Sequence, residues 1–223
     1  MGYDEREAEA YRVAVRSLAK FTKTEVTPID SARLASSGLF RRPLDRRGRM
    51  YDLYSNAPCS TEFAISRFLT PMLAQTGWAL FVDCDVVFRG SPLAMPLDDS
   101  KAVMVVKHRP LPSEGTKMDG QAQQAYERKN WSSVVVFNCD HPANRRLTLQ
   151  DVNERPGRDL HAFYWLHDDE IGELPPEWNW LVNVTPKPGD PKICHFTNGG
   201  SWLPDWRGAP YDEIWLEAAG RHG

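Results

Sequence analysis

The stretch Phe81-Val82-Asp83-Cys84-Asp85-Val86-Val87-Phe88 indicates the fold class of this chain. It continues the apolar residues Trp78-Ala79-Leu80, and a run of this kind is typical of a central strand that is covered on both faces of a sheet. Two carboxylates interrupt the run. Because side chains alternate along a strand, Asp83 and Asp85 are predicted to point the same way, about 6–7 Å apart.

Two acids at the end of a buried strand require something to offset their desolvation. A cation or a proton relay can do so, and a hard divalent cation with open coordination positions fits best, because such ions bind carboxylates together with substrate phosphates. The alternative is that Asp83 and Asp85 lie just past the strand end and cap the turn toward Arg89-Gly90.

The length of 223 residues predicts one α/β domain that spans residues 1–223. A net charge of −3 gives no reason to expect nucleic acid as a partner. No apolar run approaches a membrane span and the N-terminus is charged, so we expect neither a signal peptide nor an anchor, and a cytoplasmic location. Reduced, buried thiols are expected at the widely spaced cysteines Cys59, Cys84, Cys139 and Cys194.

Helical and strand patterns alternate along the first part of the chain. Residues 5–21 predict a helix, and Glu25 to Ile29 a short strand. Met1 leaves no room for a strand before that helix, so the first strand of the fold is expected to be truncated. Residues 35–59 are predicted to form an arginine-rich loop, either a solvated surface or a lip for an acidic substrate. Ser60 is a candidate N-cap for a helix that ends at Gly77.

The second half predicts strands at 101–107, 132–137 and 192–196, and a polar loop at 110–130 that forms a lid or a substrate wall. His195 ends the last strand and precedes Gly199-Gly200, whose backbone N–H groups can cradle an anion. A neutral imidazole there completes a mixed N/O metal site that suits Mn²⁺, although a single histidine is more often structural. Asp168 and Asp169 either favour a helix dipole or hold a substrate hydroxyl.

Taken together and in order, these segments resemble the family 8 glycosyltransferases and their relatives of GT-A fold, which have a Rossmann-like mixed central sheet flanked by helices. Phe81-Val82-Asp83-Cys84-Asp85 looks like their D-x-D motif, and Lys192-Ile193-Cys194-His195-Phe196 looks like their late histidine segment. The resemblance implies that Asp83, Asp85 and His195 bind Mn²⁺ or Mg²⁺, which holds the diphosphate of a nucleotide sugar.

The resemblance also implies roles for further residues. Arg67, in Ser66-Arg67-Phe68-Leu69, corresponds to a basic residue that reaches the donor sugar or phosphate. Asp168-Asp169 resembles a pair whose first member holds donor-sugar hydroxyls. The remaining residues assigned to the donor, at the nucleotide-binding start or at the diphosphate, are Tyr3, Asp4, Tyr11, Lys117, Gly199 and Gly200. Two departures concern the sugar and the phosphates: Trp131-Ser132-Ser133 stands where the family has Asn-Ser-Gly, and no lysine follows Gly200.

The function predicted on this basis is transfer of a hexose from a nucleotide sugar, with UDP-sugar as the expected donor, to a hydroxyl of a carbohydrate or other acceptor, with retention of configuration. Two alternatives stay open from the sequence. One is a haloacid-dehalogenase-type phosphatase that uses the Asp83-Cys84-Asp85 loop. The other is a sugar-nucleotide-binding module without catalysis.

Overall fold

A computed structural model describes residues 1–48, 50–109, 128 and 130–221. Its central feature is a four-stranded sheet in the order β4-β7-β6-β8, formed by Trp78–Val82, Val134–Asn138, Val103–Val105 and Ile171–Glu173. β7 is antiparallel to both β4 and β6, whereas β8 is parallel to β6. The apolar composition of β6 and β7 explains their place inside this sheet, because β-branched and aromatic side chains fill both faces of a covered sheet.

A second sheet has the order β5-β10-β9, formed by Val86–Phe88, Ile193–His195 and Trp180–Leu181. β10 is antiparallel to β5 and parallel to β9. The apolar run of residues 81–88 is therefore not one strand. The Asp83 amide still bonds to Ser133 O beside the first sheet, but Asp85 O already accepts from the Phe196 amide of the second. The chain passes from one sheet to the other at the two acids.

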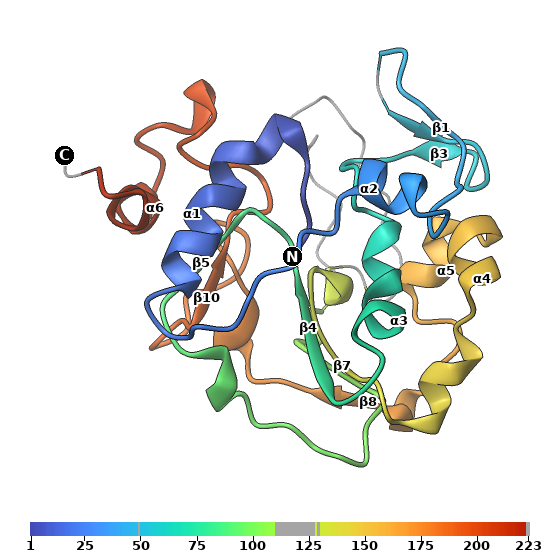
Figure 1. Ribbon diagram of the computed structural model, residues 1–223. Coiled ribbons are helices and arrows are strands. Elements are labelled where there is room, and N and C mark those ends of the chain that lie inside the picture. Colours follow the sequence, from blue (N-terminus) through green and yellow to red (C-terminus); the bar gives the residue numbers. More distant parts are fainter. Residues whose placement is uncertain (49, 110–127, 129, 222–223) are drawn as a thin grey trace.

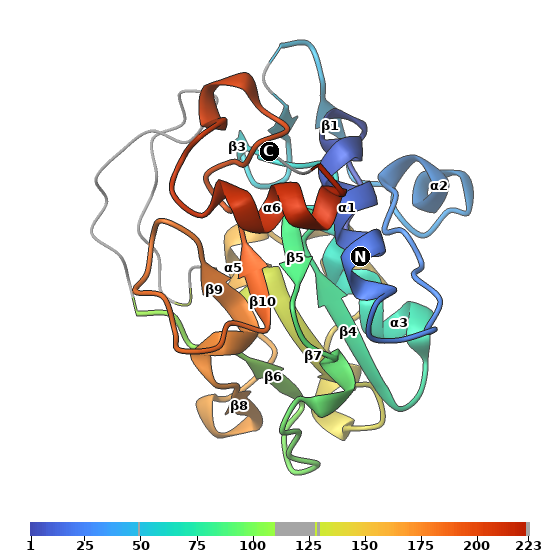
Figure 2. The same ribbon diagram turned by 90° about the vertical axis from the view of Figure 1, so that its left-hand side faces the viewer.

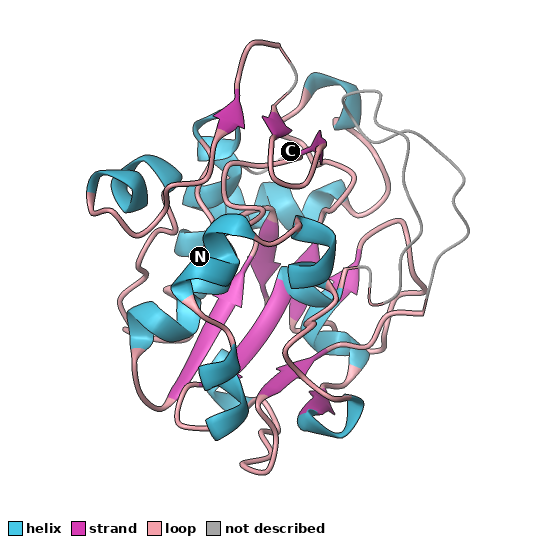
Figure 3. Cartoon of the chain, turned by 90° about the vertical axis from the view of Figure 1, so that its right-hand side faces the viewer, coloured by secondary structure: helices cyan, strands magenta, loops and turns pink. Residues whose placement is uncertain are grey.

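Helices cover the sheets on two sides. On one side, α1 (Ala8–Leu18) packs against β5 and against α6 (Asp212–Ala219), as Figures 1 and 2 show. On the other side, α3 (Thr70–Ala74) contacts β4 and β7, next to α4 (Leu149–Glu154) and α5 (Gly157–His161). Figure 3 shows the helices in front of the strands when the molecule is viewed from this second side. The architecture is thus a mixed α/β arrangement with the sheets in the middle, as predicted.

The N-terminal residues lie beside β4 and bond to it. The Gly2 amide bonds to Val82 O at 2.9 Å, and Gly2 forms a parallel bridge with Ile29. The prediction of a strand at Glu25 to Ile29 was therefore wrong except for Ile29 itself, since the preceding residues make no ladder in the described chain. Gly2 thus bonds to β4 on one side and to Ile29 on the other, and truncation of a first strand stays a prediction.

Two predicted helices differ from the observed ones. Residues 5–21 form a 3-10 turn, η1 (Glu5–Glu7), followed by α1, and Val13 is buried whereas Ala19 is exposed. Ser60 caps no helix, because residues 60–65 form turns and the helical part begins with η2 (Ser66–Leu69), which leads into α3. The α3 helix ends at Ala74, and Gly77 follows with a left-handed backbone (φ 71°).

Residues 35–59 form more than a loop. They contain the end of α2 (Ser31–Ser36) and a small antiparallel sheet of β1 (Leu44–Asp45), β2 (Tyr51–Asp52) and β3 (Ala57–Pro58). The prediction of a solvated arginine surface was wrong for Arg42, which is buried in an ion pair with Asp52. Arg42 stands in the same arginine-rich segment as the exposed Arg41 and Arg46, so no local pattern indicates that it is buried.

Short 3-10 turns connect the remaining elements. They are η3 (Pro92–Ala94), η4 (Trp131–Ser133), η5 (Pro142–Arg146), η6 (Asp168–Glu170), η7 (Pro176–Asn179) and η8 (Pro204–Trp206). The predicted strands at 101–107, 132–137 and 192–196 are confirmed in shortened form as β6, β7 and β10. Within the described residues, no helix is both long and apolar enough to cross a membrane.

Candidate metal centre

The point where the chain changes sheets brings three potential metal ligands together. Asp83 and Asp85 lie between β4 and β5, and His195 is the last residue of β10, in register with Val86. Its Nε2 atom lies 3.2 Å from Asp85 Oδ1 and 4.0 Å from Asp83 Oδ2. One ligand atom from each of the three residues falls within 4.8 Å of the others. Antiparallel pairing of β5 with β10 is therefore what joins sequence positions more than a hundred residues apart.

The surroundings concentrate negative charge. The side chains of Asp83 and Asp85 are only 16% and 14% exposed. Burial, and after it the charge of Asp85, raises the pKa of Glu7 to about 7, although a hydrogen bond from Cys84 Sγ opposes the shift. Burial also raises the pKa of the Cys84 thiol well above its usual range. A cation bound here would offset the repulsion between the carboxylates.

Arg67 forms an ion pair with Asp83, one of the two acids of the cluster. Its NH1 group lies 2.8 Å from Asp83 Oδ1 and also donates to Ser132 O at 2.8 Å, while its Nε donates to Ala64 O. The guanidinium carbon lies 5.4 Å from the ring centroid of Phe63 and 5.0 Å from that of Phe81. Arg67 is thus buried and bonded to Asp83 and to two backbone carbonyls, and its contact with a donor sugar or phosphate stays a prediction.

The second ring nitrogen of His195, Nδ1, is hydrogen-bonded to Asn179. Nδ1 lies 3.1 Å from Oδ1 of Asn179, which is fully buried at the end of η7. Asn179 Nδ2 donates to Ser133 Oγ at 3.0 Å, and Ser133 Oγ in turn donates to Asn130 O at 2.7 Å. This chain of buried polar groups connects the candidate ligand to the segment that precedes β7.

The residues predicted to bind the nucleotide at the chain start lie beside α1. The rings of Tyr3 and Tyr11 meet edge to face, 5.1 Å apart, and both are half-buried. Asp4 is buried, caps η1, and accepts hydrogen bonds from Arg6 and from the Glu62 amide. Its carboxylate is therefore engaged in joining the chain start to residue 62, and a nucleotide-binding role for it stays a prediction.

Gly199 and Gly200, in the turn after β10, have a structural role in the fold. The Gly199 amide donates to Phe196 O at 2.7 Å, and Gly199 has a φ of 129°. At Gly200, a Cβ atom would come within 2.2 Å of the Trp202 ring. The two glycines are thus required by a turn and by ring packing, so their anion-cradling role stays a prediction. Lys117 lies outside the described residues, as does most of the predicted lid at 110–130.

Asp168 and Asp169 are not brought to the cluster. They belong to η6, just before β8, and Ile171 is level with Val103 and Phe137 across the sheet. Asp83 is level with Ser133, which precedes Phe137 by four residues, and this separation corresponds to about 13 Å along the strands. Asp168 is exposed and paired with Arg128. A role for these two acids in donor binding stays a prediction that this placement does not support.

Sequence reasoning missed three residues at this site. No role at the site was predicted for Asn179, Ser133 or Glu7. His108 is a fourth, more distant case: burial, and after it the charge of His195, lowers its pKa to about 4. No local signal identifies Asn179, because its place beside His195 depends on the pairing of β9 with β10.

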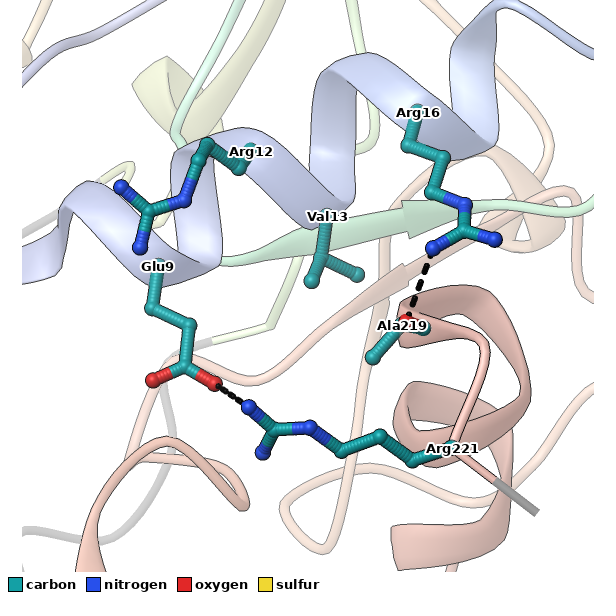
Figure 4. A pocket seen from close by; sticks show the side chains of 6 residues that line it. All are labelled: Glu9, Arg12, Val13, Arg16, Ala219 and Arg221. Atoms are coloured by element: carbon teal, nitrogen blue, oxygen red, sulfur yellow. Dashed lines mark hydrogen bonds and ion pairs between the residues drawn. The ribbon is translucent and has the colours of Figure 1, made fainter.

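A separate pocket of about 320 Å³ lies between α1 and α6. Figure 4 shows its lining, in which Arg221 pairs with Glu9 and Arg16 donates to Ala219 O. The pocket shares no residue with the candidate metal centre. Its polar groups tie the two helices to each other.

Comparisons with solved structures agree with the fold. An active-site mutant of LgtC aligns with a TM-score of 0.57 at 17% sequence identity, covering 98% of this chain and 94% of that chain. The glycosyltransferase GlyE of Streptococcus pneumoniae aligns with a TM-score of 0.55 at 12% identity, covering 98% of this chain and 58% of that one. This chain thus spans little more than half of GlyE. At these identities the likeness establishes a GT-A-like fold.

No protein-family model matches the sequence. A curated plant protein, Protein CDI of Arabidopsis thaliana, is 42% identical over 227 residues, an alignment that covers 97% of this chain and 83% of that protein. Identity of this extent over nearly the whole chain shows common descent. This chain, built on a GT-A-like fold, belongs to the same family as Protein CDI of Arabidopsis thaliana.

Proposed function

We propose that this protein is a metal-dependent glycosyltransferase that moves a hexose from a UDP-sugar to a hydroxyl of a carbohydrate or other acceptor, with retention of configuration. The observation that carries the proposal is the meeting of Asp83, Asp85 and His195 where the chain passes between two sheets of a GT-A-like fold. The solved neighbours support it, since one of them is a galactosyltransferase in complex with donor and acceptor sugar analogues. The catalytic unit proposed is a single domain of residues 1–223.

The three side chains fit a divalent cation. Two carboxylates and one imidazole form a mixed oxygen and nitrogen set, which suits Mn²⁺ and, less well, Mg²⁺. The partly exposed carboxylates leave one side of the cluster open, whereas His195 is almost completely buried. When bound, such an ion supplies Lewis-acid stabilisation of the charge that develops on the leaving diphosphate.

The other residues organise this centre. Arg67 fixes Asp83 through a short ion pair, so that one carboxylate oxygen remains directed toward His195. Burial of the cluster reduces the effective dielectric constant around the reacting phosphate, which strengthens each charge interaction there. We propose no side-chain nucleophile: both acids of the cluster are assigned to the cation, so retention follows a front-face path.

The phosphatase alternative is not favoured, because the fold matches glycosyltransferases over 98% of the chain. The non-catalytic binding module makes the same binding predictions as the transferase and differs in turnover alone. An experiment on this protein must therefore measure both binding and sugar release.

The test is calorimetric titration of UDP with and without Mn²⁺, followed by an assay of UDP release from UDP-glucose and UDP-galactose. We expect metal-dependent UDP binding that is lost in Asp85→Asn, and metal-dependent release of UDP. Asp45→Asn is the matched control, because Asp45 lies in β1, outside the cluster. Binding without turnover, with or without added sugar acceptors, would support the binding module. Metal-independent UDP binding, or full activity in Asp85→Asn, would refute the metal centre.

A further inference from the structure

We infer that Asn179 is a positioning residue for His195: it keeps the imidazole proton on Nδ1 and so directs the lone pair of Nε2 at the cation held by Asp83 and Asp85. The inference rests on the proposed metal centre and adds to it a residue that touches neither the cation nor the donor. It follows from the sheet pairing, the hydrogen-bond chain and the burial of the groups involved.

The sheet pairing places Asn179 beside the histidine. β9 runs parallel to β10, with Leu181 opposite His195 and Trp180 opposite Cys194. Asn179 is the last residue of η7 and comes directly before β9, two residues ahead of Leu181. The pairing of β9 with β10 therefore brings the end of η7 next to His195, and the Asn179 amide reaches Nδ1 at 3.1 Å.

The partners of the Asn179 amide fix which of its two atoms faces the histidine. At the far end, the group approaches Ser133 Oγ at 3.0 Å and Asn130 O at 3.5 Å. A backbone carbonyl can only accept a hydrogen bond, and the Ser133 hydroxyl donates its own hydrogen to that carbonyl. The atom of Asn179 that faces them must be the NH₂ group, so the carbonyl oxygen, Oδ1, faces His195.

This orientation determines the tautomer of the imidazole. Oδ1 of Asn179 accepts, so Nδ1 of His195 must carry a proton. In the neutral ring Nε2 then has a lone pair, and it points at Asp85 Oδ1, 3.2 Å away, and toward Asp83. A lone pair and two carboxylates repel each other unless a cation or a proton lies between them. Without Asn179, the proton would move to Nε2 and bond to Asp85, which occupies the ligand position.

Burial makes the effect large enough to measure. Asn179 is 0% exposed, His195 1% and Ser133 4%, so bulk water does not replace the lost acceptor. Partners of this kind, bonded to the remote nitrogen of a metal-binding histidine, change metal affinity by about 10–100-fold when they are removed. The same range is expected here.

The test compares Asn179→Leu, which removes the acceptor, with Asn179→Asp, which keeps an oxygen directed at Nδ1. Mn²⁺ affinity is measured by titration, and the side-chain ¹⁵N resonances of His195 are recorded in the metal-free protein, with His195→Gln used for their assignment. We expect a roughly 10–100-fold weaker Mn²⁺ affinity in Asn179→Leu and a near wild-type affinity in Asn179→Asp. The His195 proton should lie on Nδ1 in wild type and on Nε2 in Asn179→Leu.

A purely structural role would give Asn179→Asp no advantage over Asn179→Leu. The buried carboxylate in Asn179→Asp faces Asn130 O, so it would disturb packing at least as much as Leu does. Equal loss of affinity in both variants, or a proton that stays on Nδ1 in Asn179→Leu, would therefore overturn the inference. If Asn179→Leu does not fold, Asn179→Asp together with the wild-type tautomer decides it. A wild type that binds no Mn²⁺ would refute the metal centre itself, even with the Nδ1 proton in place.

Discussion

Removing Asp52 is expected to destabilise the protein far more than removing an acid from the same small sheet. Asp52 accepts from Arg42 Nε at 2.9 Å and Arg42 NH2 at 2.6 Å, and also from Ser55 Oγ and the Tyr54 amide. The side chains of Arg42 and Asp52 are 0% and 2% exposed. In Asp52→Ala, the guanidinium loses its counter-charge where water cannot replace it.

The expected loss follows from that burial. Breaking one side of a buried ion pair costs about 3–5 kcal/mol, because the remaining charge is left uncompensated. For a domain of this size each kcal/mol lowers Tm by about 2–4 °C, so Tm should fall by about 6–20 °C. Arg42 also donates to Val152 O at 3.1 Å, so the small sheet and α4 should loosen together.

The assay is urea denaturation followed by far-UV circular dichroism, with Asp45→Ala as the control. Asp45 pairs with Arg47 at 2.9 Å, but the arginine side chain is 92% exposed, and surface pairs contribute little. We expect an unchanged urea midpoint in the control. The double variant Arg42→Met/Asp52→Leu should recover most of the loss, because it leaves no buried charge. A loss below about 1 kcal/mol in Asp52→Ala would contradict the assignment of a buried, mutually dependent pair.

Two further predictions concern packing and pH. Gly200→Ala should destabilise the protein by about 1–3 kcal/mol, because the added Cβ would lie 2.2 Å from the Trp202 ring. The loss is measured by urea denaturation. The control is Gly189→Ala, where a Cβ meets open space, and it should leave the urea midpoint unchanged. Hydrogen bonds from Arg46 lower the pKa of Glu62 below the ordinary 4.5, so this carboxylate contributes stability above that pH and loses it as the pH falls through the folded pKa. Glu62→Gln should therefore flatten the acid limb of a Tm-against-pH curve, and an unaltered limb would assign acid sensitivity to other carboxylates.

The sequence by itself determined the elements whose side chains carry a strong local pattern. Short apolar runs predicted β4, β6, β7 and β10, and the alternation of charge and apolar residues predicted α1. The D-x-D spacing of Asp83 and Asp85 indicated a shared side for the two acids before any contact was known. These features depend on neighbours within a few residues, which is the range over which periodicity and propensity act.

Only the tertiary structure decided which distant residues meet and which charges are buried. The run at 81–88 divides between two sheets because Asp83 bonds to the segment before β7 and Asp85 to the residue after β10. That division, together with β9 beside β10, brings Asn179 onto His195. Arg42 looks like its exposed neighbours in sequence, yet the contact with Asp52 and Val152 O buries it. Long-range pairing selects these partners through packing and desolvation, and no local pattern encodes either.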